Sequence, residues 1–270
     1  MVRAPRSPYE LTSGSALDDL HPVLRTYFAA IPAGMRGHGS GTFEVVGTPR
    51  RWLWPALSVL ARQGVLFPVW EHNVPFTVVN APLVDRDGRT AVVAVRRFHF
   101  LGGARAMVDA ITAENPGADG LVDHLGLERR FRVRLSTRVV RGELHLASTG
   151  FDLRIGRQHF ALPAALSPRL TLIERFDDAA RAQRVSVTVD APVIGRVYEY
   201  TGTFTYELRA EGEEEIPDAA DTDPAATASV TATEAAAAVD TDADTARVVR
   251  PGVEADLDAE DPQDAGSGSR

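Results

Sequence analysis

The chain has 270 residues, with 29 basic and 37 acidic side chains and no cysteine. The lack of cysteine excludes disulfides, thiolate metal sites and cysteine nucleophiles. No stretch approaches the roughly 20 apolar residues of a membrane-spanning helix, and the first 30 residues lack the apolar run of a signal peptide. We therefore expect a soluble, cytoplasmic protein.

The composition changes abruptly after Arg209. Residues 211–270 hold 17 acidic residues and three arginines, a formal charge of −14, whereas the rest of the chain carries a formal +6. The acidic part has no aromatic residue, so it cannot bury enough apolar surface to offset its ordering entropy. The chain is thus predicted to have three parts: a flexible N-terminus (1–14), a single β-rich domain (15–209) and a disordered acidic Ala/Asp/Thr-rich tail (210–270).

Two helices are predicted in the first part of the domain. Apolar residues recur at three- and four-residue spacing over residues 15–30, which predicts a helix there. A second helix is predicted to begin at Pro49, because proline suits the first helical position, and to end at Gly64. Between the two, Gly37, Gly39 and Gly41 follow a helix and open a strand. A dinucleotide loop has the reverse order, so these glycines indicate a flexible strand entry.

From residue 65 onward the apolar period becomes two, which is typical of strands. Strands are predicted at residues 42–46, 65–69, 76–79, 91–100, 131–139, 143–147, 151–155, 170–176, 185–189 and 197–206, while 106–112 fit either helix or strand. Asp87-Gly88 predicts a hairpin turn. Because the connections are short, the strands should pair antiparallel. The predicted fold class is α+β and β-dominated: an antiparallel meander of about eight to ten strands, forming a barrel-like or strongly curved sheet.

One predicted strand carries a stripe of arginines, formed by Arg130, Arg132, Arg134 and Arg138. Proteins that bind nucleic acid use basic faces, but they interleave aromatic side chains for base stacking, and this stripe has none. We expect a solvated strand face and no nucleic-acid partner. The histidines form no recognised metal motif, and the sequence has no Gly-x-Ser-x-Gly nucleophile elbow. No metal or cofactor is therefore expected.

Several charged or hydroxyl-bearing side chains lie within otherwise apolar strands. A charge that faces a protein interior is costly unless it is paired and hydrogen-bonded. Such residues either form a structural cluster, in which Arg97 meets Glu174 or Asp109, or make the polar end of a pocket. The candidate ligand-binding residues are Arg97, His99, Asp109, Asp123, Glu174, Tyr198 and Tyr200. The apolar lining expected for such a pocket is Phe98, Phe100, Leu172, Val187 and Phe204.

Short motifs recur in a fixed order along the domain. They are Gly39-x-Gly41-x-Phe43, Arg97-Phe98-x-Phe100, Gly120-Leu121-Val122-Asp123, Leu162-Pro163 through Pro168, Glu174, Pro192-x-x-Gly195 and Tyr198-x-Tyr200-x-Gly202-x-Phe204. In these motifs the chain resembles, from about His21 to Leu208, a bacterial family known as domain of unknown function 4166. Where that family tends to have Glu after Gly-Leu-x, this sequence has Asp123, which is one methylene shorter.

The resemblance implies an accessory or ligand-binding domain. Members of the family are often fused to, or encoded beside, Rossmann-type oxidoreductases that resemble saccharopine dehydrogenase. This chain has no Rossmann domain and carries the acidic tail instead, so the resemblance implies a partner rather than an established reaction.

Three functions are open. The first is a module that binds a small apolar or amphipathic ligand in a β-rich cavity. The second is an interaction protein that works with a Rossmann-type oxidoreductase, its acidic tail screening the arginine face or recruiting a basic partner. The third is an acid–base enzyme, which needs two of Asp109, Asp123, Glu174 and Glu199 in one cleft, with one pKa raised by burial. We rank them in that order, with the enzyme last.

Overall fold

The structure, a computed structural model, describes residues 6–84, 88–114, 120–156 and 158–212. The predicted acidic tail, apart from its first three residues, and Asp87 of the predicted hairpin turn lie outside the described residues. No helix in the described part of the chain is long and apolar enough to cross a bilayer.

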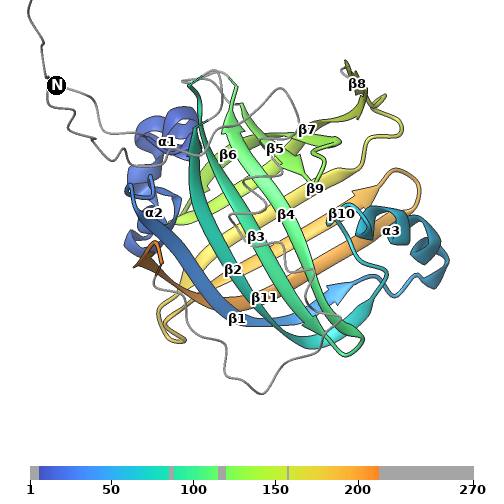
Figure 1. The fold of residues 1–270 in the computed structure, drawn as a ribbon, viewed down its shortest axis with the longest axis horizontal. Coiled ribbons are helices and arrows are strands. Elements are labelled where there is room, and N and C mark those ends of the chain that lie inside the picture. The colour runs from blue at the N-terminus through green and yellow to red at the C-terminus, as the bar shows by residue number, and fades with distance from the viewer. Residues whose placement is uncertain (1–5, 85–87, 115–119, 157, 213–270) are drawn as a thin grey trace, which may run out of the picture.

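Ten strands form one closed antiparallel ring (Figure 1). Each strand pairs with the next one along the chain, β7 pairs with both β6 and β9, and the last strand returns to pair with the first. The strands of the ring are β1 (Met35–Gly47), β2 (Trp70–Val84), β3 (Thr90–Phe100), β4 (Gly103–Ala113), β5 (Leu121–Leu125), β6 (Phe131–Val140), β7 (Glu143–Ile155), β9 (Arg169–Asp177), β10 (Ala182–Ala191) and β11 (Gly195–Ala210). The short strand β8 (Gln158–Ala161) pairs with the end of β7 and lies outside the ring.

This architecture confirms the predicted β-dominated meander and shows that it closes into a barrel. Most predicted strands lie within observed ones, and the ambiguous segment 106–112 belongs to β4. The strand predicted at residues 65–69 is wrong, because this segment is irregular and leads into β2. Residues 143–147 and 151–155 belong to one strand, β7, with an irregularity in its pairing to β6 near Leu135.

Short helices cover the two ends of the ring. At one end lie α1 (Pro8–Ser13), the 3-10 helix η1 (Gly14–Asp19) and α2 (Pro22–Phe28), and at the other end η2 (Arg51–Leu53) and α3 (Trp54–Ala61) (Figure 1). The single helix predicted over residues 15–30 is therefore wrong. Pro22 has no backbone N–H and instead opens the new helix α2. The helix α1 lies within residues 1–14, the segment predicted to be flexible.

The start of α1 is fixed to the end of α2. Ser7 and Glu10 form a capping box at the start of α1. The Ser7 hydroxyl also donates to the carbonyl of Phe28 at 2.6 Å, and a carboxylate oxygen of Glu10 accepts from the N–H of Ala30 at 3.2 Å. The three N-terminal helices thus form one cap over this end of the barrel, which we call the helical cap.

Inward-facing glycines make room for aromatic rings in the barrel. Gly37, Gly39 and Gly41 belong to β1 and lie opposite Leu208, Tyr206 and Phe204 of β11. A Cβ atom at Gly37 would overlap the Tyr206 ring, and one at Gly41 would overlap the backbone and side chain of Phe204. These glycines belong to the strand itself rather than to a flexible entry, because rings fill the space that their side chains leave.

The barrel interior is filled by two groups of side chains. On the β1, β2, β3 and β11 side, the ring of Phe43 stacks on Phe76 at a centroid distance of 3.9 Å and on Phe98 at 5.3 Å. Toward the helical cap, leucines of η1 and α2 pack on apolar side chains of β4 to β7. We call the first group the aromatic core. The rest of the inner wall, from β4 to β10, is lined mainly by aliphatic side chains.

Three arginines of the stripe, on β6 or just before it, form ion pairs. Arg130 pairs with Glu128, and Arg132 pairs with Glu114. An Nη1 atom of Arg134 contacts both carboxylate oxygens of Asp152, at 2.6 and 2.8 Å. Asp152 of β7 and two glutamates in the connections on either side of β5 therefore neutralise much of the stripe.

A glycine substitution tests the packing of rings on glycines. We expect Gly202→Ala in β11 to lower the free energy of unfolding by about 1–3 kcal/mol, because its Cβ atom would overlap Thr42 and Phe43 of β1. Gly102→Ala is the matched control, since no atom lies within 4 Å of its Cβ position. Urea denaturation of both variants measures the difference, and equal unfolding midpoints would contradict this packing.

Candidate functional site

The barrel holds a cavity of about 320 Å³ beside the aromatic core. Its volume is within the range of small-molecule sites, which begins near about 300 Å³. Most of its lining is aliphatic and comes from opposite walls, for example Met107 and Ile111 of β4, Leu135 of β6, Leu146 of β7, Leu172 of β9 and Val187 of β10. The closed sheet therefore encloses an apolar space.

Charged side chains from three adjacent strands line one part of this cavity. Arg96 of β3, Asp109 of β4 and Asp123 of β5 all line it, together with Tyr200 of β11. Asp109 lies opposite Ala94, two residues from Arg96, and Asp123 lies opposite Ile111, two residues from Asp109. The three charged side chains thus follow a diagonal across the sheet, and Arg96 and Asp109 form an ion pair.

Burial controls the protonation of this diagonal. The pKa of Asp123 is raised well above its usual value, first by burial and then by the negative charge of Asp109. Burial also raises the pKa of Asp109, and the ion pair with Arg96 opposes that rise. Burial is the largest single effect on Arg96 and disfavours its charge, but Asp109 together with Tyr200, Tyr27 and Asp123 outweighs burial, so the pKa of Arg96 is raised. Asp109 is thus stabilised as a carboxylate by Arg96, whereas burial and the charge of Asp109 both favour the protonated form of Asp123.

Asp123 also has an unused hydrogen-bonding atom. Its Oδ1 atom is buried and has no hydrogen-bond partner in the described part of the chain. Leaving a buried polar atom unpaired costs about 1–3 kcal/mol, which is why such atoms are rare outside functional positions. In its neutral form the Asp123 carboxyl can both donate and accept, so it is suited to hold a polar group within the cavity.

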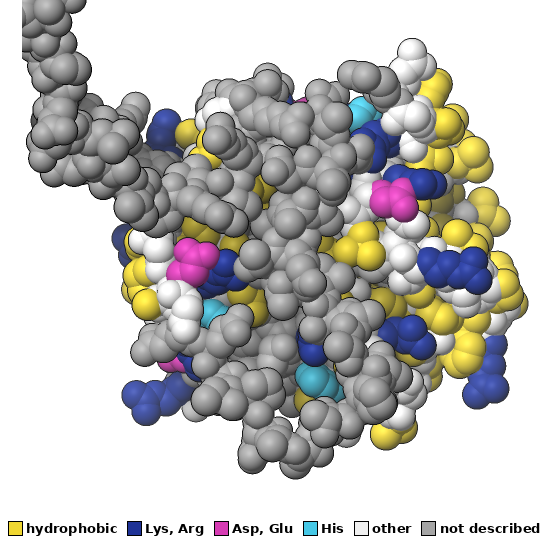
Figure 2. Space-filling model, viewed as in Figure 1, with side chains coloured by type: hydrophobic (Ala, Val, Ile, Leu, Met, Phe, Trp, Pro, Cys, Tyr) yellow, Lys and Arg dark blue, Asp and Glu magenta, His cyan; other side chains and the backbone are white. Residues whose placement is uncertain are grey.

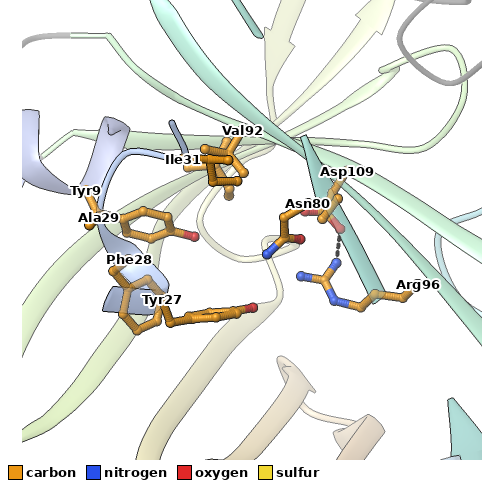
Figure 3. Close-up of a pocket in the computed structure, with 11 residues that line it drawn as sticks. Tyr9, Tyr27, Phe28, Ala29, Ile31, Asn80, Val92, Arg96 and Asp109 are labelled. Atoms are coloured by element: carbon orange, nitrogen blue, oxygen red, sulfur yellow. Dashed lines mark hydrogen bonds and ion pairs between the residues drawn. The ribbon is translucent and has the colours of Figure 1, made fainter. Parts of the chain in front are cut away.

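A second, smaller cavity of about 30 Å³ lies between the same ion pair and the helical cap. Figure 3 shows Tyr9 and Tyr27 pointing from the helices toward Asn80, Arg96 and Asp109 on the strands. Tyr9 lines both cavities. Burial raises the pKa of both tyrosines, so their hydroxyls stay protonated. The smaller space is large enough for a water molecule, and the ion pair together with Tyr9 separates it from the larger one.

Glu174 lies elsewhere in the barrel interior. It is 3% exposed, and one of its carboxyl oxygens accepts from the side-chain amide of Gln183 at 3.4 Å. Burial raises its pKa to about 8, and Arg96 and the Gln183 hydrogen bond limit that rise. It does not line the larger cavity among the described residues.

The structure brings three of the seven candidate residues to the cavity: Asp109, Asp123 and Tyr200. Arg97 and His99 alternate with the inward Phe98 and face the outside of the barrel. Tyr198 is fully buried, and its hydroxyl accepts from the N–H of Phe67 at 3.4 Å. Of the expected apolar lining, Leu172 and Val187 line the cavity, whereas Phe98, Phe100 and Phe204 belong to the aromatic core.

Arg96 and Tyr9 contribute polar groups to the site but are not among the candidates. Arg96 takes the place expected of Arg97, and the signal was present, because strand alternation puts Arg96 on the same face as Phe98. Tyr9 comes from a segment that was expected to be flexible. Its signal was the capping pattern of Ser7 and Glu10, which starts a helix at that point. Among the described residues, no group of three His, Asp or Glu side chains is arranged to hold a metal ion.

The raised pKa of Glu174 predicts a pH dependence of stability. Its folded pKa is near 8 and its unfolded value near 4.5, so the folded state loses stability as the pH rises between these values. We expect Glu174→Gln to gain stability relative to the native chain at pH 8.5, by a few kcal/mol at most, and to show no gain near pH 4.5. Urea unfolding at both pH values measures this. Asp18→Asn, an exposed carboxylate variant, is the control, and a pH-independent difference for Glu174→Gln would refute the assignment.

Comparison with other proteins gives a family. The chain is 25% identical over 197 residues to the uncharacterized protein YndH of Bacillus subtilis (strain 168), an alignment that covers 70% of this chain and 92% of YndH. No solved structure matches the chain. Residues 20–204 match the family described as Domain of unknown function (DUF4166). This match covers nearly all of the barrel and confirms the resemblance seen in the sequence motifs, so the chain belongs to the DUF4166 family.

Proposed function

We propose that the barrel binds a small, largely apolar molecule with an oxygen-bearing polar end. The observation that carries this proposal is the cavity of about 320 Å³, whose walls are mainly aliphatic and include the charged diagonal of Arg96, Asp109 and Asp123. Ligand sites in proteins combine these two features, because apolar walls provide affinity and a few polar groups fix orientation.

The polar diagonal determines which end of a ligand it would hold. Arg96 is already neutralised by Asp109, so the cluster has little net charge to attract an ion. The protonated form of Asp123, which burial favours, and the hydroxyl of Tyr200 can both donate hydrogen bonds, and burial keeps Tyr200 protonated by raising its pKa to about 12. A carbonyl or hydroxyl oxygen would satisfy these donors, while the rest of the molecule lies against Leu146 and Leu172.

The way into the cavity is defined by what closes the barrel. The helical cap and Tyr9 close one end. On the other side, the cavity is lined by the end of α3 and the connection after it, through Leu60 and Leu66, and by the segment between β8 and β9, through Leu162 and Pro168. We infer that a ligand enters between these two connections.

Filling the cavity should abolish binding. We expect Leu146→Trp to remove binding of N-phenyl-1-naphthylamine, an uncharged apolar fluorescent probe, because the indole occupies the cavity. Leu101→Trp makes the same exchange at a fully exposed position and should bind the probe like the native chain. Leu135→Phe is a smaller change that fills the same space if Leu146→Trp does not fold. Probe fluorescence and thermal melting are measured together, and a well-folded filled variant that still binds the probe would refute the cavity.

A second experiment tests the polar end. The probes are 2-acetonaphthone, which has a carbonyl oxygen, and 2-ethylnaphthalene, which matches it in size without one; each displaces N-phenyl-1-naphthylamine. We expect Asp123→Leu to weaken binding of the ketone about tenfold, as loss of one buried hydrogen bond implies, and to leave the hydrocarbon unchanged. Asp123→Asn keeps a neutral donor and should bind the ketone well. Equal loss for both probes would show that Asp123 only shapes the wall.

One observation favours acid–base catalysis as a second candidate. Asp109 and Asp123 share one cavity and the pKa of each is raised, which is the arrangement that the enzyme hypothesis requires. Glu199 does not take part, because it is ion-paired with Arg196. Mass spectrometry of small molecules that copurify with the native chain and with Asp123→Asn separates the candidates: the same molecule in both indicates binding, and different molecules indicate turnover.

Work with a Rossmann-type oxidoreductase stays a prediction that rests on the sequence resemblance. The acidic segment 211–270 is the part of the chain that would recruit or screen a basic surface, given its formal charge of −14. Its removal should then alter partner binding and the dependence of that binding on salt.

A further inference from the structure

Exposed hydrophobic side chains gather at one end of the barrel. Eight large hydrophobic side chains are exposed among the described residues, and seven of them lie at the α3 end. We call these seven the apolar rim: Trp52, Val59, Leu101, Ile155, Phe160, Leu166 and Val193. The eighth, Val23, lies on α2 in the helical cap. Single exposed apolar residues are ordinary, but a grouped set marks an interaction surface.

The apolar rim is assembled by the fold and not by one sequence segment. Its members come from the β1–β2 connection, the β3–β4 turn, the region around β8 and the β10–β11 turn. Strand directions in an antiparallel ring place all of these connections at the same end. Figure 2 shows hydrophobic side chains interspersed with arginines along the side of the molecule where α3 and β8 lie in Figure 1.

Two apolar side chains in turns of the rim are exposed without contributing to the packing of the fold. Val193 has a φ of 66°, a conformation that a β-branched residue rarely adopts, and its side chain is fully exposed. Glycine or asparagine would fit that turn with less strain. Leu101 is 99% exposed and precedes two glycines at the tip of the β3–β4 turn. Both positions present an apolar side chain to the outside at some cost.

The same end of the barrel is basic. In the described residues, the connections at the α3 end carry five arginines and one glutamate, whereas those at the opposite end carry five arginines and six acidic residues. Arg51 and Arg62, on either side of α3, are exposed. The apolar rim is therefore combined with an excess of positive charge, and the other end is not.

We propose that the apolar rim and its arginines dock on the surface of an anionic lipid bilayer. Apolar side chains that insert below the headgroups, flanked by basic residues that attract anionic lipids, are the two contributions that hold a protein at a membrane surface. The connections that carry Val59 and Leu166 also supply cavity-lining residues, Leu60 and Pro168. Docking would therefore turn the inferred entrance of the cavity toward the lipid. The proposal goes beyond ligand binding, because it does not require the cavity to be occupied.

Vesicle co-sedimentation of the full chain tests the proposal. We expect the native chain to sediment with vesicles of phosphatidylcholine and phosphatidylglycerol in equal amounts, much less with phosphatidylcholine alone, and less at high salt. The variant Trp52→Ser/Leu101→Ser/Val193→Gly should bind the mixed vesicles at least about tenfold more weakly, since three apolar contacts are lost. Val23→Ser, at the opposite end, is its control and should bind like the native chain.

A double arginine substitution tests the electrostatic attraction to anionic lipids. Arg51→Gln/Arg62→Gln should weaken binding to the mixed vesicles about tenfold, whereas Arg25→Gln/Arg181→Gln, two exposed arginines at the other end, should not. A native chain that stays in solution with mixed vesicles, or a rim variant that sediments like it, would overturn membrane docking; in that case the rim fits a protein surface instead. The rim variant should still bind N-phenyl-1-naphthylamine, because none of its three substitutions lines the cavity. Loss of the cavity would instead abolish probe binding and leave vesicle binding intact, so failure of one proposal can be told from failure of the other.

Discussion

Closure of ten strands into one ring is the constraint on which the rest of the molecule depends. The diameter of a barrel grows with its number of strands, and about eight are the number whose own side chains fill the interior. Ten strands enclose more space than that. The aromatic core fills one side, with rings seated on the glycines of β1 and β11, and the helical cap covers one end. The space that neither fills is the cavity.

The closed ring also determines the electrostatics of the interior. Arg96 is in range of Asp109, Asp123 and Glu174 and favours the ionised form of each, yet burial raises the pKa of all three. One guanidinium cannot neutralise three buried carboxylates, so burial favours protonation of the carboxyls that it leaves uncompensated. Burial thus favours the neutral form of the carboxyls around one ion pair, which suits polar but uncharged parts of a molecule better than ions.

Most of the barrel could be predicted from strand alternation, because an apolar period of two residues is visible in the sequence without knowledge of the fold. The same rule contained the correct inward arginine: Arg96 shares a face with Phe98, and Arg97 does not. The single N-terminal helix failed because apolar spacing continues through Pro22, whose effect on the backbone outweighs the pattern. The cavity itself could not be predicted, since its volume is the difference between what ten strands enclose and what side chains from both ends fill.

The contacts that fix α1 to α2 give the first residues of the chain an importance that their composition hides. Ser7 and Glu10 bind the backbone at the end of α2, and between them Tyr9 borders both cavities. Through these contacts α1 helps to close the helical-cap end of the barrel. A chain trimmed to residues 15–209, the limits that apolar patterning suggests, would keep the ten strands of the ring but lose α1, and with it Tyr9 from the lining of both cavities, so that water could reach the Arg96–Asp109 pair from the helical-cap end.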